Sequence, residues 1–307
     1  MKTIKLLCSL LLTTVVPTFA HDLYLMPEKF VAAAGTHLRV FFQNGDEFPA
    51  GVSAVKPERL RNTKLVSRAG SAMFESITAE AKRTTALVRV PGTGLAFLTA
   101  ETLPSLITLD PKKFRSYLEH ENLTNAMTWR DSHGEGGKPG RERYSKYVKS
   151  LIQVEKSDTY YRARTGLAIE IIPEADPYSL KPGATLPVQV FFRGAPAADV
   201  AVESAWLENG KAKMEVVGRT DANGRARITV KATGPHRLHA IVMVRCAAPE
   251  AADSGILRHR RAVVGSGEDQ VADRKVAARR RRPADSPSCF QPTIAASTTD
   301  DSRRAVT

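Results

Sequence analysis

Short runs of apolar and β-branched residues, separated by turn residues, dominate residues 22–100 of the chain. Gly35, Gly70 and the pair Asn44-Gly45 are among the turn residues that punctuate them. Runs at such close spacing, without helical patterns between them, predict an antiparallel β-sandwich. The predicted strands are residues 30–32, 38–42, 71–77, 85–90 and 95–100.

A second set of strand-like runs follows after residue 165. Asn223-Gly224 can form a tight turn between two of them, because both residue types tolerate positive φ. The runs are residues 167–172, 186–192, 200–206, 226–231 and 236–244. We therefore expect a second, immunoglobulin-like sandwich over residues 161–250.

Residues 106–160 differ from both sets. Asp110 can cap a helix that begins at Pro111, and its apolar residues follow at helical spacing. A second helical segment is predicted from the spacing of Arg141, Tyr144, Tyr147, Val148 and Leu151, with its basic residues on a solvated face. The expected architecture is mainly β, with sandwich domains over residues 21–105 and 161–250 joined by a short helical segment.

The first 20 residues have the pattern of a signal peptide. Lys2 and Lys5 precede an apolar stretch at residues 6–16, and small residues at Thr18 and Ala20 favour cleavage before His21. The alternatives are an uncleaved anchor, which this apolar stretch is too short to form comfortably, and a lipoprotein modified at Cys8. We expect export to a bacterial periplasm, with no stable membrane insertion.

Residues 251–307 lose the strand pattern. They contain one aromatic residue, Phe290, and a run of four arginines at 279–282. A segment with so little apolar material is expected to be a disordered basic tail, because burial cannot offset the entropy of ordering it. A tail that binds anionic surfaces and a shift of the reading frame near residue 253 are alternative explanations.

Composition and motifs argue against several classes of function. The 307 residues are 42% hydrophobic and 25% charged, with a net charge of +13, part of which lies in the two end segments. A basic total of this kind is weak evidence for nucleic acid, and none is expected as a partner. The three cysteines are too far apart for a cysteine zinc site and indicate no disulfide framework. The sequence also lacks nucleophile-elbow, Walker A, paired-histidine zinc and dinucleotide motifs, so no enzyme is predicted.

Histidines carry the candidate chemistry. Cleavage before His21 would give this residue a free α-amine beside its ring, and two nitrogens of one residue can chelate a late transition metal. His239, in the last predicted strand, is the first candidate for a second ligand, and His133, in a glycine-rich loop, is the reserve. Each of these three can instead be structural. A copper site for oxidative chemistry is a further alternative, but it lacks an identifiable third ligand.

Several segments together resemble the secreted bacterial domain-of-unknown-function 4198 family. They are residues 20–25, 114–123, 141–149, 173–178 with 181–183, and 220–225, and the string Arg141-Glu-Arg-Tyr-Ser-Lys-Tyr147 is the most specific. The resemblance implies an exported β-sandwich protein of nickel or cobalt uptake, without established enzymatic activity. Similar proteins often carry a histidine where this chain has Val242, and their usual ending is missing beyond residue 253.

Two functions follow as hypotheses. The first is a periplasmic protein that binds nickel or cobalt, rather than copper or zinc, and buffers the ion or delivers it to a membrane uptake transporter. The second is a metal-free interaction module that binds a protein partner or a cell-surface glycan. The metal content of the native protein would distinguish them.

Overall fold

The computed structural model describes residues 21–46, 48–245, 256–264 and 290–293. The elements of this part of the chain are β1 (Leu23–Pro27), β2 (Val31–Ala32), β3 (His37–Asn44), η1 (Pro57–Arg59), β4 (Leu60–Ser67), β5 (Gly70–Met73), β6 (Ser76–Ala79), β7 (Thr84–Arg89), β8 (Gly94–Thr102), β9 (Ser105–Leu109), α1 (Pro111–His120), α2 (Thr124–Ser132), β10 (Gly140–Val154), η2 (Thr159–Arg162), β11 (Ile169–Pro173), η3 (Pro177–Ser179), β12 (Thr185–Phe192), β13 (Ala195–Pro196), β14 (Ala201–Glu208), β15 (Lys211–Arg219), β16 (Arg225–Thr229), β17 (Gly234–Arg245), β18 (Ile256–Val264) and β19 (Phe290–Thr293). The predicted mainly β fold class is confirmed.

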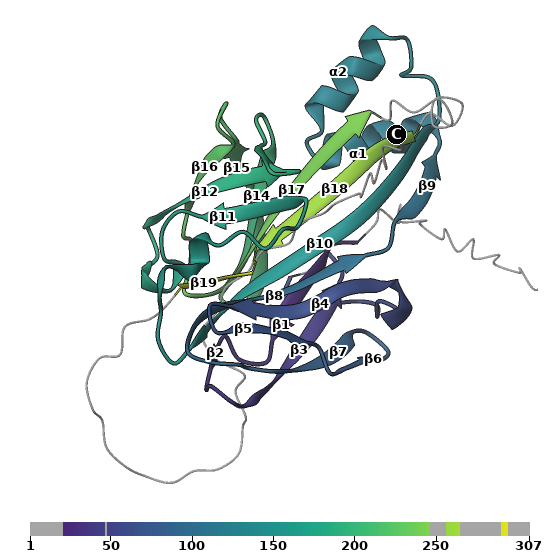
Figure 1. The fold of residues 1–307 in the computed structure, drawn as a ribbon. Helices are drawn as coiled ribbons and strands as arrows, with labels where there is room; N and C mark the ends of the chain where they lie inside the picture. Colours follow the sequence, from purple (N-terminus) through teal and green to yellow (C-terminus); the bar gives the residue numbers. More distant parts are fainter. Residues whose placement is uncertain (1–20, 47, 246–255, 265–289, 294–307) are drawn as a thin grey trace, which may run out of the picture.

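One large sheet runs through the molecule, and a small sheet packs on each of its faces (Figure 1). The large sheet has the strand order β15-β14-β17-β18-β10-β8-β4-β5 along its main path. The first small sheet has the order β1-β3-β7-β6, and the second joins β11, β12, β13 and β16. Strands from both halves of the sequence therefore share the large sheet.

Two apolar cores lie on opposite faces of the large sheet. On β8, Leu95 and Phe97 belong to the core under the second small sheet, whereas Ala96 and Leu98 belong to the core under the first. This division follows from the strand geometry, in which successive side chains point to opposite faces. Both faces of β8 are buried, so its sequence is a continuous apolar run rather than an alternating one.

Strand β10 corrects the predicted second helix. Residues 140–154 form a 15-residue strand that pairs with β8 and β9, and so they are not helical. Tyr147 and Leu151 enter one core, and Val148 and Ile152 enter the other. Burial on both faces puts apolar residues at adjacent positions, and such a run imitates helical spacing.

The connection between the halves also differs from the prediction. β10 belongs to the large sheet that both halves share, so the expected helical joint between two separate sandwiches is wrong. Lys146 and Lys149 are buried, which overturns the predicted solvated basic face for these two residues. The immunoglobulin-like assignment of the halves stays a prediction.

The helical part of residues 106–160 is α1 and α2. The cap of α1 is confirmed, because the Asp110 carboxylate accepts a hydrogen bond of 2.9 Å from the amide of Lys113. The α1 helix packs on the start of β10, where a side chain at Gly140 would overlap the ring of Phe114. Helix α2 was not predicted from the sequence.

The ends of the chain are described only in part. Residues 1–20, the predicted signal peptide, lie outside the described residues. Of the predicted disordered tail, residues 256–264 form β18, which pairs with β10 and β17, and residues 290–293 form β19. The prediction of disorder is wrong for these two segments, because the backbone groups of β10 and β17 offer hydrogen-bond partners that need no apolar side chains. The remainder of residues 251–307 lies outside the described residues.

Within the described residues, neither helix has the length and apolar character needed to cross a membrane.

Candidate functional site

Register places a histidine beside a carboxylate in the middle of the large sheet. In the antiparallel pair of β14 and β17, Glu203 lies opposite His239, and Ala205 lies opposite Arg237. Leu238 on β17 points into the core under the second small sheet. Its neighbours Arg237 and His239 must therefore point to the other face, where Glu203 also lies.

Asp22 completes this group from the other end of the sequence. It immediately precedes β1, which pairs with β3 along its whole length. The Asp22 carboxylate forms an ion pair of 2.8 Å with Nη1 of Arg237, and Arg237 Nη2 lies 2.5 Å from Oε1 of Glu203. We call Asp22, Glu203, Arg237 and His239 the buried cluster.

The buried cluster brings three residues with possible metal-ligand atoms close together. Nε2 of His239 lies 3.6 Å from Oδ1 of Asp22, and Nδ1 of His239 lies 3.7 Å from Oε1 of Glu203. One ligand atom from each of these three residues lies within 4.8 Å of the other two. His239 is only 5% exposed, and its Nε2 has no hydrogen-bond partner among the described residues.

Electrostatics favours the ionised forms of the cluster. Burial alone would lower the pKa of His239, but the carboxylates of Asp22 and Glu203 outweigh burial and raise it. Burial would likewise raise the pKa of Glu203, but His239 and Arg237 lower it. Each shift thus favours the charged form of the group concerned, the imidazolium of His239 and the carboxylate of Glu203.

A small cavity adjoins the cluster beside the end of α1. Its volume is about 10 Å³, close to the space that one water molecule or ion occupies. Glu203 and His239 line one side, and His120 and Glu121 line another. Helix α1 is held there by Phe114, Tyr117 and Leu118, which pack against Ile241 of β17.

The three histidines predicted as ligands have different surroundings. His239 lies in the buried cluster. The ring of His21 is directed elsewhere, with its Nδ1 3.0 Å from Oδ2 of Asp46, while Asp22, the next residue, reaches His239. His133 follows α2, stacks on Trp129 at a centroid distance of 4.1 Å, and is not part of the cluster. The predicted pairing of the His21 ring with His239 is thus absent from the described contacts.

Sequence reasoning missed Asp22, Glu203 and Arg237. The signal for Asp22 was its position beside His21, and the signal for Glu203 was a charged residue within an otherwise apolar strand. Neither signal identifies a partner. The pairing of β14 with β17, and the position of β1 next to these strands, depend on the whole fold.

Asp22, Glu203 and His239 offer ligand atoms of the kinds that divalent metal ions take. Two carboxylates and an imidazole are common ligands of divalent transition metals. At metal–ligand distances of about 2.0–2.2 Å, two ligand atoms lie no more than about 4.4 Å apart, and the ring nitrogens of His239 already lie 3.6 and 3.7 Å from the carboxylate oxygens of Asp22 and Glu203. Arg237 opposes binding because it is a permanent cation beside both carboxylates. The residues fit a divalent ion whose affinity is reduced by the arginine.

Comparisons with known proteins place this geometry in context. Residues 18–244 match the model of a family described as Domain of unknown function (DUF4198). No curated protein matches the chain. Among solved structures, the D0-D1 domain of intimin matches with 12% identity and a TM-score of 0.22, covering 78% of this chain and 95% of that chain. The Escherichia coli adhesin FdeC matches with 11% identity and a TM-score of 0.21, covering 91% and 90%. Likenesses this weak carry no argument about function.

Proposed function

The chain belongs to the family of domain-of-unknown-function 4198, and we propose that it binds a divalent transition-metal ion through Asp22, Glu203 and His239. The observation that supports the proposal is that the buried Nε2 of His239 makes no hydrogen bond to a described residue, although it lies 3.6 Å from Oδ1 of Asp22. A neutral imidazole nitrogen in that place can coordinate a metal once its proton leaves.

Nickel or cobalt is the proposed ion. Imidazole and carboxylate ligands suit both ions, and geometry rather than raw affinity separates them from copper and zinc in such sites. Arg237 keeps the affinity modest, because an ion must share the two carboxylates with the guanidinium. Modest affinity suits a protein that buffers an ion outside the cytoplasm or passes it to a membrane uptake transporter. We also propose that the two halves are immunoglobulin-like sandwiches that hold this site.

Processing of the N-terminus would add to the site. Cleavage before His21 would leave a free α-amine on the residue that precedes Asp22. Consecutive Cα atoms are about 3.8 Å apart, so this amine would lie close to Asp22. Mass spectrometry of the exported protein should then give a chain that begins at His21. An intact Met1 on protein recovered from the periplasm would contradict the export proposal but not the binding by Asp22, Glu203 and His239.

A metal-free interaction module is the second candidate, and one observation favours it. The two ion pairs of Arg237 already tie Asp22, at the start of β1, to β14 and β17. On this interpretation, the buried cluster fastens the N-terminal segment to the large sheet and has no ligand.

Calorimetric titration distinguishes the two candidates. Nickel and cobalt should each bind the untagged protein saturably, and His239→Ala should weaken binding at least tenfold, or about 1.4 kcal/mol. Binding should also weaken as the pH falls, because the raised pKa of His239 lets a proton compete for the ring.

His133→Ala is the matched control, because this histidine stacks on Trp129 outside the cluster. It should leave the affinity unchanged. If His239→Ala lowers the melting temperature but not the affinity, or if neither metal binds more tightly than about 1 mM, the cluster is structural.

A further inference from the structure

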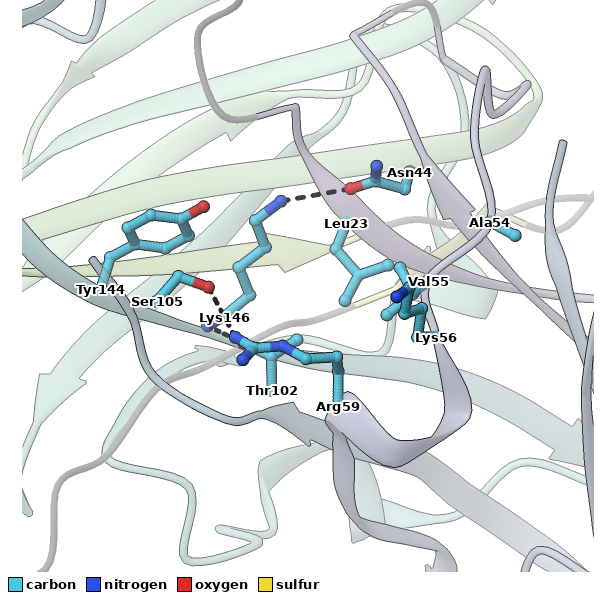
Figure 2. A pocket seen from close by; sticks show the side chains of 10 residues that line it. All are labelled: Leu23, Asn44, Ala54, Val55, Lys56, Arg59, Thr102, Ser105, Tyr144 and Lys146. Atoms are coloured by element: carbon cyan, nitrogen blue, oxygen red, sulfur yellow. Dashed lines mark hydrogen bonds between the residues drawn. The ribbon is translucent and has the colours of Figure 1, made fainter. Parts of the chain in front are cut away.

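A second pocket lies beside the N-terminal segment, with Leu23 of β1 in its lining (Figure 2). It has a volume of about 230 Å³, and its lining comes from β1, β3, β8, β9, β10 and the segment at residues 54–59. This volume is below the roughly 300–1,000 Å³ of pockets for drug-sized ligands, so its occupant must be small.

The lining of this pocket is strongly basic. Lys56, Arg59 and Lys146 line it, and none of its ten lining residues in the described part of the chain is acidic. Uncharged polar groups of Asn44, Ser105 and other residues lie among these cations (Figure 2). A concave site with one sign of charge concentrates ligands of the opposite sign.

Among the described residues, the guanidinium of Arg59 is held in place by hydrogen bonds from only one of its nitrogens. Its Nη2 donates to the carbonyls of Leu103 and Pro104, at 2.7 and 3.1 Å, and to Oγ of Ser105 at 2.5 Å. All three acceptors are uncharged, and no acid among the described residues forms an ion pair with Arg59. An arginine has five N–H donors, and Nε and Nη1 make no hydrogen bond to described residues. A fixed guanidinium of this kind keeps its positive charge and can donate single hydrogen bonds from Nε and Nη1 to an anion.

Lys146 and Lys56 place further positive charge around the same space. Lys146 comes from β10, is only 9% exposed, and donates to Oδ1 of Asn44 at 3.2 Å and to the carbonyl of His21. These two acceptors hold the ammonium group in place beside the pocket. Lys56 is exposed and lies just before η1, where it can approach a ligand from the solvent side.

We propose that this pocket binds a small organic anion that carries two or three carboxylates. The cations provide charge and hydrogen-bond donors, while Leu23, Ala54 and Val55 provide apolar surface for a short carbon skeleton. The apolar part of the lining and the size of the pocket favour such a molecule over a bare inorganic anion. The proposal is independent of metal binding by the buried cluster.

Calorimetric titration of citrate and succinate into the metal-free full-length protein tests the proposal. Metal is removed on a chelating resin, so that citrate cannot act through a bound ion. We expect saturable binding of one citrate, weaker binding of succinate, and an affinity that falls as the salt concentration rises. Arg59→Gln should weaken citrate binding at least tenfold, and Lys56→Gln about threefold.

Lys112→Gln is the matched control, because Lys112 is an exposed lysine on α1 outside the pocket lining. It should leave citrate binding unchanged. Arg59 also supports the β8–β9 connection, so Lys56→Gln keeps the test valid if Arg59→Gln does not fold. No citrate binding tighter than about 10 mM, equal losses in Lys56→Gln and Lys112→Gln, or equally tight binding of orthophosphate would each overturn the proposal.

Discussion

Two histidines on one strand show how strongly the local environment sets the chemistry of a residue. His236 and His239 are both on β17 and both buried, but they are an odd number of positions apart and point to opposite faces. His239 meets two carboxylates, which raise its pKa. Burial lowers the pKa of His236 to about 4, and a hydrogen bond with the carbonyl of Gly234 opposes this shift only in part.

The lowered pKa of His236 predicts an acid-sensitive component of stability. Its unfolded pKa is about 6.5, so between pH 6.5 and 4 the unfolded chain binds more protons than the folded one. The free energy of unfolding should therefore decrease with falling pH, by about 3 kcal/mol at pH 4 from this residue alone. Urea unfolding of the protein and of His236→Leu, measured at pH 7 and pH 4, isolates the effect. Parallel pH profiles for the two proteins would show that His236 does not contribute.

At the same scale, the sequence identified His239 but not its partners. A histidine in a predicted strand is recognisable as a candidate ligand. Asp22, Glu203 and Arg237 come together only because β14 pairs with β17 and the residue before β1 contacts β17. His133 was a plausible ligand because its loop is rich in glycine. The fold instead stacks its ring on Trp129.

At the scale of the element, β10 joins the two halves of the molecule. It passes between both cores, and its buried Lys149 forms an ion pair of 2.8 Å with Glu170 of β11, in the second small sheet. Burial lowers the pKa of Lys149, so its charge depends on Glu170. Burial would raise the pKa of Glu170, but Lys149 and the amides of Thr165 and Gly166 lower it.

Removal of one partner of this ion pair should be costly. Glu170→Gln leaves the Lys149 ammonium buried without a counter-charge, and should lower the free energy of unfolding by about 3–5 kcal/mol. Lys149→Met combined with Glu170→Gln should recover more than half of that loss, because no buried ammonium is left without a counter-charge and the glutamine oxygen can still accept from one of the two amides. Chemical denaturation of the three proteins measures both effects. A double variant as unstable as Glu170→Gln would contradict the ion-pair explanation.

Strands β3 and β7 of the first small sheet were predictable, and β10 was not, for one physical reason. Residues 38–42 and 85–90 have one buried face, and their alternation appears in β3 and β7 as expected. β10 is buried on both faces over much of its length and contains buried lysines, so neither alternation nor hydrophobicity identified it as a strand.

At the scale of the whole molecule, the three layers of strands bring Asp22, just before β1, next to β17. β1 belongs to one small sheet, yet Asp22 at its start reaches Arg237 and His239 in the large sheet. The mainly β class was predictable from composition and turn spacing. The shared large sheet was not, because its order includes the pairing of β10 with β18, whose partner residues lie more than 100 positions apart.

Cobalt bound to the protein tests the central claim most directly, through anomalous X-ray scattering from crystals grown with the ion. The account predicts one strong peak, about 2.0–2.2 Å from a ring nitrogen of His239 and from carboxylate oxygens of Asp22 and Glu203. A map from crystals at saturating cobalt with no peak in the buried cluster, or with its peak at His133 or another surface histidine, would contradict the account.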